Sequence, residues 1–122
     1  MAQFSFVIQY VRSPADSAAF YSTLLGIPVV ESSPTFAMLP LREGVMLGLW
    51  IETGVQPKPT GAAGRNELAL TADSDAALEA LHARWLANGA RIAQAPVRMD
   101  FGYTFVALDP DGNRLRVLVP GG

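Results

Sequence analysis

The 122-residue chain runs twice through one order of predicted elements, and this repetition constrains its fold more than any other feature. Each half is expected to begin with a strand, continue with a helix and end with three short strands. The predicted strands are 4–11, 29–31, 36–39 and 45–51 in the first half, and 67–72, 91–95, 103–108 and 114–119 in the second half. A half of about 60 residues has too little core to be stable alone, so we expect the two halves to pack side by side.

Local signals mark the ends of the two predicted helices. Ser13 before Pro14 is typical of a capped first turn, and Gly26 predicts the end of the first helix. Asp73 or Ser74 is expected to cap the second helix. The apolar stripe that would bury this helix consists of Leu78, Leu81, Trp85 and Leu86.

Composition excludes several classes of function. Half of the residues are hydrophobic and 16% are charged, a balance opposite to that of disordered chains. The net charge of −2 and the absence of a basic run leave no surface suited to nucleic acid or anionic lipid. With no cysteine, a disulfide framework, a thiolate metal site and a cysteine nucleophile are excluded. No apolar run approaches about 18 residues and no signal peptide is predicted, so we expect a cytoplasmic protein that does not bind membranes.

A stretch rich in proline and glycine separates the two halves. Residues 56–64 are predicted to link a module of residues 1–55 to a module of residues 65–122 within one domain. A second stretch of this kind, Asp109–Asn113, lies between the last two predicted strands. Its proline and glycine predict a hairpin turn, so we interpret its polar side chains as structural.

Strand periodicity assigns two faces to each predicted sheet. The aliphatic faces are expected to pack against the helices, while the opposite faces mix aromatic residues, methionine, glycine and a few charges. Such a mixture is typical of the wall of a small-molecule pocket, although a half-exposed sheet or a dimer interface would have the same composition. The predicted wall residues are Phe36, Met38, Met46, Gly48, Trp50, Glu67, Met99, Phe101, Tyr103 and Arg116.

Three segments together resemble the vicinal oxygen chelate superfamily of glyoxalases, bleomycin resistance proteins and dioxygenases. They are Val11–Tyr21, Leu25-Gly26 and Asp109–Asn113, and the resemblance covers essentially the whole chain. It implies an α+β fold in which paired βαβββ modules form an open, cup-shaped mixed sheet with a helix on the outer face of each module. It also implies a homodimer, which would bury exposed apolar edges.

The enzymes of this superfamily hold a divalent metal ion in the cup. Carried over to this chain, their ligand positions on the first, fifth and last strands fall on Phe6, Glu67 and Arg116. A phenyl ring cannot ligate a metal, and a guanidinium repels one. We therefore expect no metal ion and no other cofactor. Phe6 is instead expected to line the cup together with Tyr10, or to plug the former metal cavity.

Within the superfamily, the chain most resembles the metal-free phenazine antibiotic resistance proteins. The similarity lies in Leu47–Trp50, Asp100–Phe105 and Arg116. It implies a protein that confers resistance by sequestration, in which a planar aromatic ligand stacks on Trp50. Arg116 would offer its planar donors to a carboxylate or carbonyl of the ligand, or would pair with Glu67 across the cup.

Two other hypotheses stay open at this point. One is a metal-dependent enzyme of the glyoxalase or dioxygenase kind, in which Glu67 holds the metal with help from Glu52 or a partner subunit. The other is a structural or regulatory module whose cup is closed by its own side chains. The single histidine, His82, lies beside the apolar stripe of the second helix and is expected to be partly exposed rather than catalytic.

Overall fold

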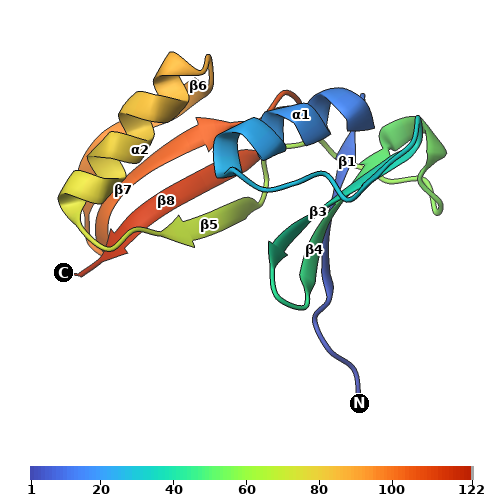
Figure 1. The fold of residues 1–122 in the computed structure, drawn as a ribbon, viewed down its shortest axis with the longest axis horizontal. Helices are drawn as coiled ribbons and strands as arrows, with labels where there is room; N and C mark the ends of the chain where they lie inside the picture. The colour runs from blue at the N-terminus through green and yellow to red at the C-terminus, as the bar shows by residue number, and fades with distance from the viewer. Residues whose placement is uncertain (122) are drawn as a thin grey trace. The chain divides into compact units, whose positions relative to one another are not determined.

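The computed structural model describes residues 1–121 and contains two compact units, Met1–Gly61 and Ala62–Gly122. The first unit comprises β1 (Phe6–Val11), α1 (Pro14–Leu25), β2 (Glu31–Ser32), β3 (Phe36–Arg42), β4 (Val45–Ile51) and the short 3-10 helix η1 (Glu52–Gly54). The second unit comprises β5 (Glu67–Thr71), α2 (Asp75–Ala87), β6 (Arg91–Met99), β7 (Gly102–Leu108) and β8 (Arg114–Pro120). Figure 1 labels both helices and all strands except β2, with the colour following the order of the chain.

The two units share one sheet topology. The first sheet has the strand order β1-β4-β3-β2 and the second has the order β5-β8-β7-β6. In each sheet the first strand of the unit pairs in parallel with the last, and the other neighbours are antiparallel. The predicted α+β fold of paired βαβββ modules is therefore confirmed.

Both helices begin as their sequences predict. The Ser13 hydroxyl accepts a hydrogen bond of 3.2 Å from the backbone N–H of Asp16, and Gly26 ends α1 with a φ of 67°. Of the two candidate caps for α2, Ser74 is the one used, since its hydroxyl accepts from the backbone N–H of Ala77 at 3.1 Å. The described residues contain no helix long and apolar enough to cross a membrane.

Each helix packs against one face of the sheet in its own unit. α1 contacts β3 and β4, where Leu39, Leu47 and Leu49 are buried. α2 contacts β6, β7 and β8 (Figure 1), and the ring centroid of its buried Trp85 lies 5.4 Å from that of Phe105. Trp85 is thus a core residue, as the apolar stripe predicts.

One member of that stripe is not in the core. Leu86 is 54% exposed, so the prediction that it packs against the sheet is wrong. The helix turns about 100° per residue, and with Trp85 directed at the sheet the next side chain lies beside the contact. His82, one turn before Leu86, is half-buried with its ring centroid 5.3 Å from that of Phe105, which agrees with the expected place beside the stripe.

Several strands differ from their predicted ranges, and β3 continues to Arg42 instead of ending at residue 39. β1 begins at Phe6 rather than at residue 4, and β2 is reduced to Glu31–Ser32. β6 continues to Met99, past Pro96, where a strand was expected to stop. Proline is tolerated there because β6 is an edge strand whose register with β7 shifts between Gln94 and Val97.

The turn between β7 and β8 is held by one buried carboxylate. Asp109 Oδ1 accepts hydrogen bonds from the backbone N–H groups of Asp111 and Asn113 at 2.9 and 2.8 Å. Asp109 Oδ2 accepts from the side-chain amide of Asn113 at 3.0 Å. The interpretation of these polar residues as turn-forming is confirmed, and the turn gives β8 a fixed starting point.

Candidate functional site

The face of the first sheet opposite α1 carries all five predicted wall residues of the first unit. We name it the aromatic face, and its residues are Phe6, Ile8, Tyr10, Phe36, Met38, Met46, Gly48 and Trp50. The three side chains on the edge strand β1 are markedly exposed, with exposed fractions of 52% for Phe6, 44% for Ile8 and 44% for Tyr10. Large apolar side chains with such exposure form a surface to which an apolar ligand can bind.

Strand pairing brings the five predicted wall residues of this unit together. Phe36 lies opposite Trp50, and Met38 lies opposite Gly48, in the antiparallel pair of β3 and β4. Met46 lies two residues before Gly48 on the same face of β4. Ile8 belongs to the same surface but was not predicted, although its place between Phe6 and Tyr10 on alternate positions of one strand is a signal that could have found it.

The rings of the aromatic face have a defined arrangement. The ring centroids of Tyr10 and Trp50 lie 6.3 Å apart with an interplanar angle of 83°, an edge-to-face contact. A Cβ atom built on Gly48 would lie 2.8 Å from Cζ of Phe36 and 3.5 Å from Ile8. The absence of a side chain at Gly48 therefore leaves room for the ring of Phe36.

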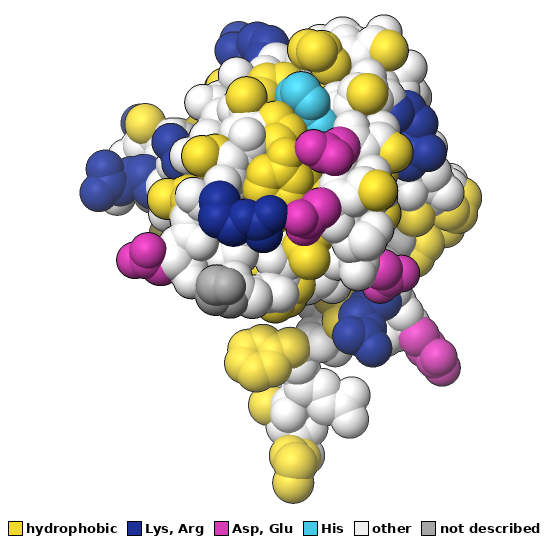
Figure 2. Space-filling view, turned by 90° about the vertical axis from the view of Figure 1, so that its left-hand side faces the viewer, with side chains coloured by type: hydrophobic (Ala, Val, Ile, Leu, Met, Phe, Trp, Pro, Cys, Tyr) yellow, Lys and Arg dark blue, Asp and Glu magenta, His cyan; other side chains and the backbone are white. Residues whose placement is uncertain are grey.

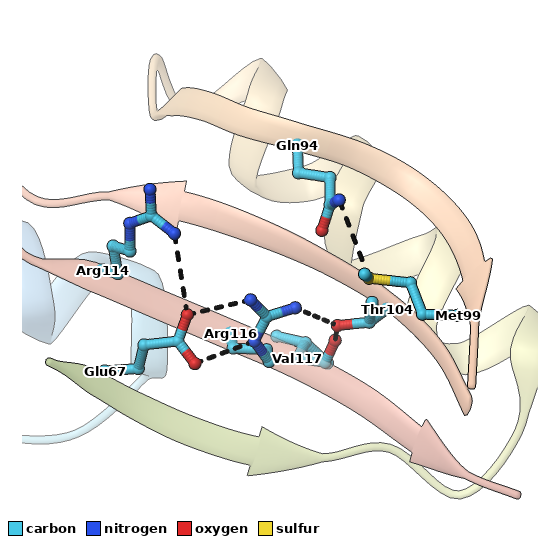
Figure 3. A network of polar contacts seen from close by, with 7 residues as sticks. All are labelled: Glu67, Gln94, Met99, Thr104, Arg114, Arg116 and Val117. Carbon is cyan, nitrogen blue, oxygen red and sulfur yellow. Dashed lines mark hydrogen bonds and ion pairs between the residues drawn. The ribbon is translucent and has the colours of Figure 1, made fainter. Parts of the chain in front are cut away.

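The face of the second sheet opposite α2 carries a polar network, shown in Figure 3. Arg116 donates from Nε to Glu67 Oε1 at 2.8 Å and from Nη2 to Glu67 Oε2 at 2.9 Å. Its Nη1 donates to Thr104 Oγ1 at 3.2 Å, and the Thr104 hydroxyl donates to the backbone carbonyl of Val117 at 2.8 Å. The predicted pairing of Glu67 with Arg116 is therefore confirmed, with both carboxylate oxygens engaged.

The contact between Glu67 and Arg116 shifts the pKa of both side chains toward their charged forms. The hydrogen bonds from Arg116 lower the pKa of Glu67, and the positive charges of Arg116 and Arg114 act in the same direction against the opposing effect of burial. Arg114 Nη1 lies 3.9 Å from Glu67 Oε2 and contributes only at longer range. Hydrogen bonding to Glu67 in turn raises the pKa of Arg116. Both groups therefore stay ionised at neutral pH.

The residues at the superfamily's metal-ligand positions do not fit a divalent metal ion. Both oxygens of Glu67 accept N–H groups of a permanent cation, which an incoming metal would have to displace. Phe6 presents a hydrocarbon ring. Among residues 1–121 there is also no group of three histidine, cysteine, aspartate or glutamate side chains that could hold a metal.

Met99 and Phe101 lie near this network. The guanidinium carbon of Arg116 lies 5.5 Å from the ring centroid of Phe101, within the range of a cation–π contact. Gln94 Nε2 donates to Met99 Sδ at 3.8 Å, and Gln94 Oε1 is buried without a hydrogen-bond partner among the described residues (Figure 3). Thr104 and Gln94 were both missed from the sequence. Because Thr104 precedes Phe105 on β7, strand alternation could have placed it on the face opposite α2. The face on which Gln94 lies depends on the register shifts in β6, which the sequence does not reveal.

Tyr103 does not share this face, so the prediction that it belongs to the same wall as Arg116 is wrong. Its hydroxyl donates to Glu79 Oε2 of α2 at 2.8 Å, and this hydrogen bond raises the pKa of Tyr103. Arg98 lies over its ring at 4.7 Å and donates to Asp75 of α2 at 2.8 Å. Figure 2 shows this side of the second unit, where acidic and basic side chains lie next to one another over apolar ones.

Comparison with known proteins identifies the family. Residues 3–117 match the family model described as Glyoxalase/Bleomycin resistance protein/Dioxygenase superfamily. The chain belongs to this superfamily. A search of the curated proteins gave no significant match.

Solved structures of the superfamily's fold resemble the chain along its length. Protein ATC0852 from Agrobacterium tumefaciens, solved by NMR in solution, is 45% identical, with 100% of both chains covered and a TM-score of 0.89. A glyoxalase/bleomycin resistance protein/dioxygenase family enzyme from Burkholderia phytofirmans PsJN is 24% identical, covering 98% of this chain and 100% of the other with a TM-score of 0.82. TnmS3, an antibiotic binding protein from Streptomyces sp. CB03234, is 20% identical, covering 99% and 98% with a TM-score of 0.75. The last two similarities show the shared fold alone.

Proposed function

We propose that this superfamily member binds planar aromatic small molecules of the phenazine kind on its aromatic face and acts by sequestration, without breaking a bond. The observation that carries the proposal is the exposure of Phe6, Ile8 and Tyr10 beside Trp50 on one sheet face. Exposure of so much apolar surface to water is unfavourable in free energy. A flat, rigid heteroaromatic molecule can cover this surface with little loss of its own conformational entropy.

The energetics favour an aromatic ligand over an aliphatic one. Each 100 Å² of apolar surface removed from water contributes about 2.5 kcal/mol, at roughly 25 cal/mol per Å². Each well-placed aromatic contact adds about 0.5–1.5 kcal/mol. The rings of Tyr10 and Trp50 meet at an interplanar angle of 83°. The ligand is expected to stack on Trp50, with Met38 and Met46 adapting to its edges.

The Glu67–Arg116 pair supports binding that does not depend on a metal ion. Both oxygens of the ionised carboxylate already accept hydrogen bonds from a guanidinium, which compensates its charge, so a cation would have to displace Arg116 to bind there. TnmS3, which has the same fold, is an antibiotic binding protein. We therefore propose that the role of this chain in the cell is antibiotic resistance by sequestration.

We further propose that the protein functions as a homodimer. Several large apolar side chains outside the aromatic face are exposed, among them Phe4, Val29 and Val30. Burying such residues against a second copy would remove them from water.

Calorimetric titration with phenazine tests the proposed function. We expect saturable binding that survives dialysis against a chelator, and a large loss of affinity in Trp50→Ala. Leu86→Ala serves as the matched control, since it removes an exposed apolar side chain from α2 and should bind as the unchanged protein does. Equal affinities of the unchanged protein and Trp50→Ala would refute stacking on Trp50, and no binding of any planar heteroaromatic compound would refute the proposed function.

The metal-dependent enzyme remains the alternative. It requires a metal held in part by Glu67, and therefore displacement of Arg116. Elemental analysis of the purified protein distinguishes the two hypotheses. A metal-dependent enzyme with one catalytic site per chain should contain about one metal ion per chain. A binding protein of the proposed kind should retain none after dialysis.

A further inference from the structure

A shallow hollow of about 420 Å³, largely open to solvent, lies at the start of β5 and β8 and is lined by residues of the second unit. Its lining residues are Gly64, Arg65, Asn66, Glu67 and Arg114. We propose that this hollow is a binding site for a small oxyanion, the carboxylate or phosphate group of a small molecule. It is separate from the aromatic face, so it goes beyond the proposed function and does not depend on it.

The charges around the hollow favour an anion. Both oxygens of its one carboxylate, Glu67, already accept hydrogen bonds from Arg116, which leaves little negative charge to repel a ligand. Arg114 lies 3.9 Å from that carboxylate, beyond hydrogen-bond distance, so its N–H donors are not saturated by Glu67. For Arg65, no hydrogen bond or ion pair is found within residues 1–121. Two guanidinium groups with unused donors therefore line one hollow.

The backbone holds these two arginines at the same place. Gly64 has a φ of +94°, and a Cβ atom built on it would lie 3.1 Å from the backbone oxygen of Gly112, so the segment before β5 lies close against the turn before β8. That turn is fixed by Asp109, whose backbone oxygen also accepts from Arg91 Nη2 at 2.9 Å. Both sides of the hollow are therefore attached to one braced turn, which limits the entropy lost on binding.

The chemistry of the donors points to oxygen anions with several acceptor atoms. A guanidinium presents parallel N–H groups whose spacing matches two oxygens of a carboxylate or phosphate. Asn66 adds a neutral amide that can donate to a further oxygen. A divalent cation is disfavoured at the same place, because Arg65 and Arg114 both repel it.

Heteronuclear NMR titrations test this site directly on the full chain. Sodium phosphate and sodium acetate are added separately at constant ionic strength, with sodium chloride as the control ion. We expect saturable shifts at the backbone amides of residues 64–67 and 114 and at the Nε–H groups of Arg65 and Arg114. Saturation by phosphate alone indicates a phosphate-bearing ligand, and saturation by acetate as well indicates that carboxylates are accepted.

Substitutions locate the effect. Arg65→Ala removes an exposed side chain without a described partner and should weaken phosphate binding at least about fivefold, whereas the double variant Arg65→Ala/Arg114→Gln should weaken it more than about tenfold. Arg42→Ala, an exposed arginine of β3 in the first unit, is the matched control and should leave binding unchanged. Equal shifts with chloride, or unchanged binding in Arg65→Ala with the spectrum of the fold intact, would overturn the proposal.

Discussion

Replacing Arg116 by methionine is expected to destabilise the protein because it leaves Glu67 ionised without its main partner. Methionine keeps much of the apolar stem of arginine but removes the donors to both oxygens of Glu67 and to Thr104. The carboxylate cannot fully recover these bonds from water, since its side chain is only 31% exposed. Arg114 remains at 3.9 Å and compensates in part.

The magnitude follows from the burial of the pair. Exposed ion pairs contribute about 0–1 kcal/mol, while breaking a fully buried one costs about 3–5 kcal/mol. The side chains of Arg116 and Glu67 are 17% and 31% exposed, which places this pair between the two limits. We expect Arg116→Met to lower the free energy of unfolding by about 2 kcal/mol after allowance for solvent screening.

Urea unfolding followed by circular dichroism measures this effect, and a double-mutant cycle isolates the pair. The cycle uses Arg116→Met, Glu67→Gln and both together, with an expected coupling of about 1–2 kcal/mol at pH 7. Arg114→Met is the matched control on the same strand, because the longer distance of 3.9 Å should make its coupling to Glu67 much smaller. Equal couplings for Arg114 and Arg116 would refute the argument from geometry.

The coupling should also depend on pH with a definite sign. The pKa of Glu67 is lowered in the folded protein from its ordinary value of 4.5, mainly by the hydrogen bonds from Arg116. The stabilisation is therefore fully present above about pH 4.5, the ordinary value, and is lost as the pH falls through the lowered pKa of the folded state. A coupling that stays constant into strong acid would show that the carboxylate charge is not its source.

Three further outcomes can be checked with simple variants. Gly48→Ala should displace the half-exposed ring of Phe36 and, because that ring can shift, lower the free energy of unfolding by at most about 1 kcal/mol, measured by urea unfolding. Gly102→Ala should be the more damaging glycine substitution, seen as a lower melting temperature, because its φ is +143° and the new Cβ would collide with the backbone of Val119. Light scattering during gel filtration should give the mass of a dimer at micromolar concentration, and a monomer mass would refute the proposed assembly.

Much of the fold could be predicted because its signals are local. Serine before each helix, glycine after the first, and the Asp109–Asn113 turn all act through hydrogen bonds or dihedral angles of neighbouring residues. The repeated order of elements was predictable for the same reason, whereas the strand order shared by the two sheets follows from the family resemblance and not from local signals.

The candidate site was predictable only where alternation is regular. β4 keeps its alternation, so Met46, Gly48 and Trp50 fall together as predicted. The segment around β6 does not, because two register shifts intervene, and this hid Gln94. Tyr103 was misplaced for a different reason, because alternation along β7 was not applied to it. Tyr103 lies two residues before the buried Phe105 and therefore on the face of the sheet that packs against α2.

The close approach of Glu67 and Arg116 has a consequence for how ligand measurements on the second unit should be interpreted. Each charge suppresses titration of the other, the acid toward lower pH and the base toward higher pH. The net charge of this pair is consequently constant between mildly acidic and mildly alkaline pH. This pair therefore adds no pH dependence of its own to a phosphate-dependent signal between mildly acidic and mildly alkaline buffers, a range in which phosphate itself changes its charge.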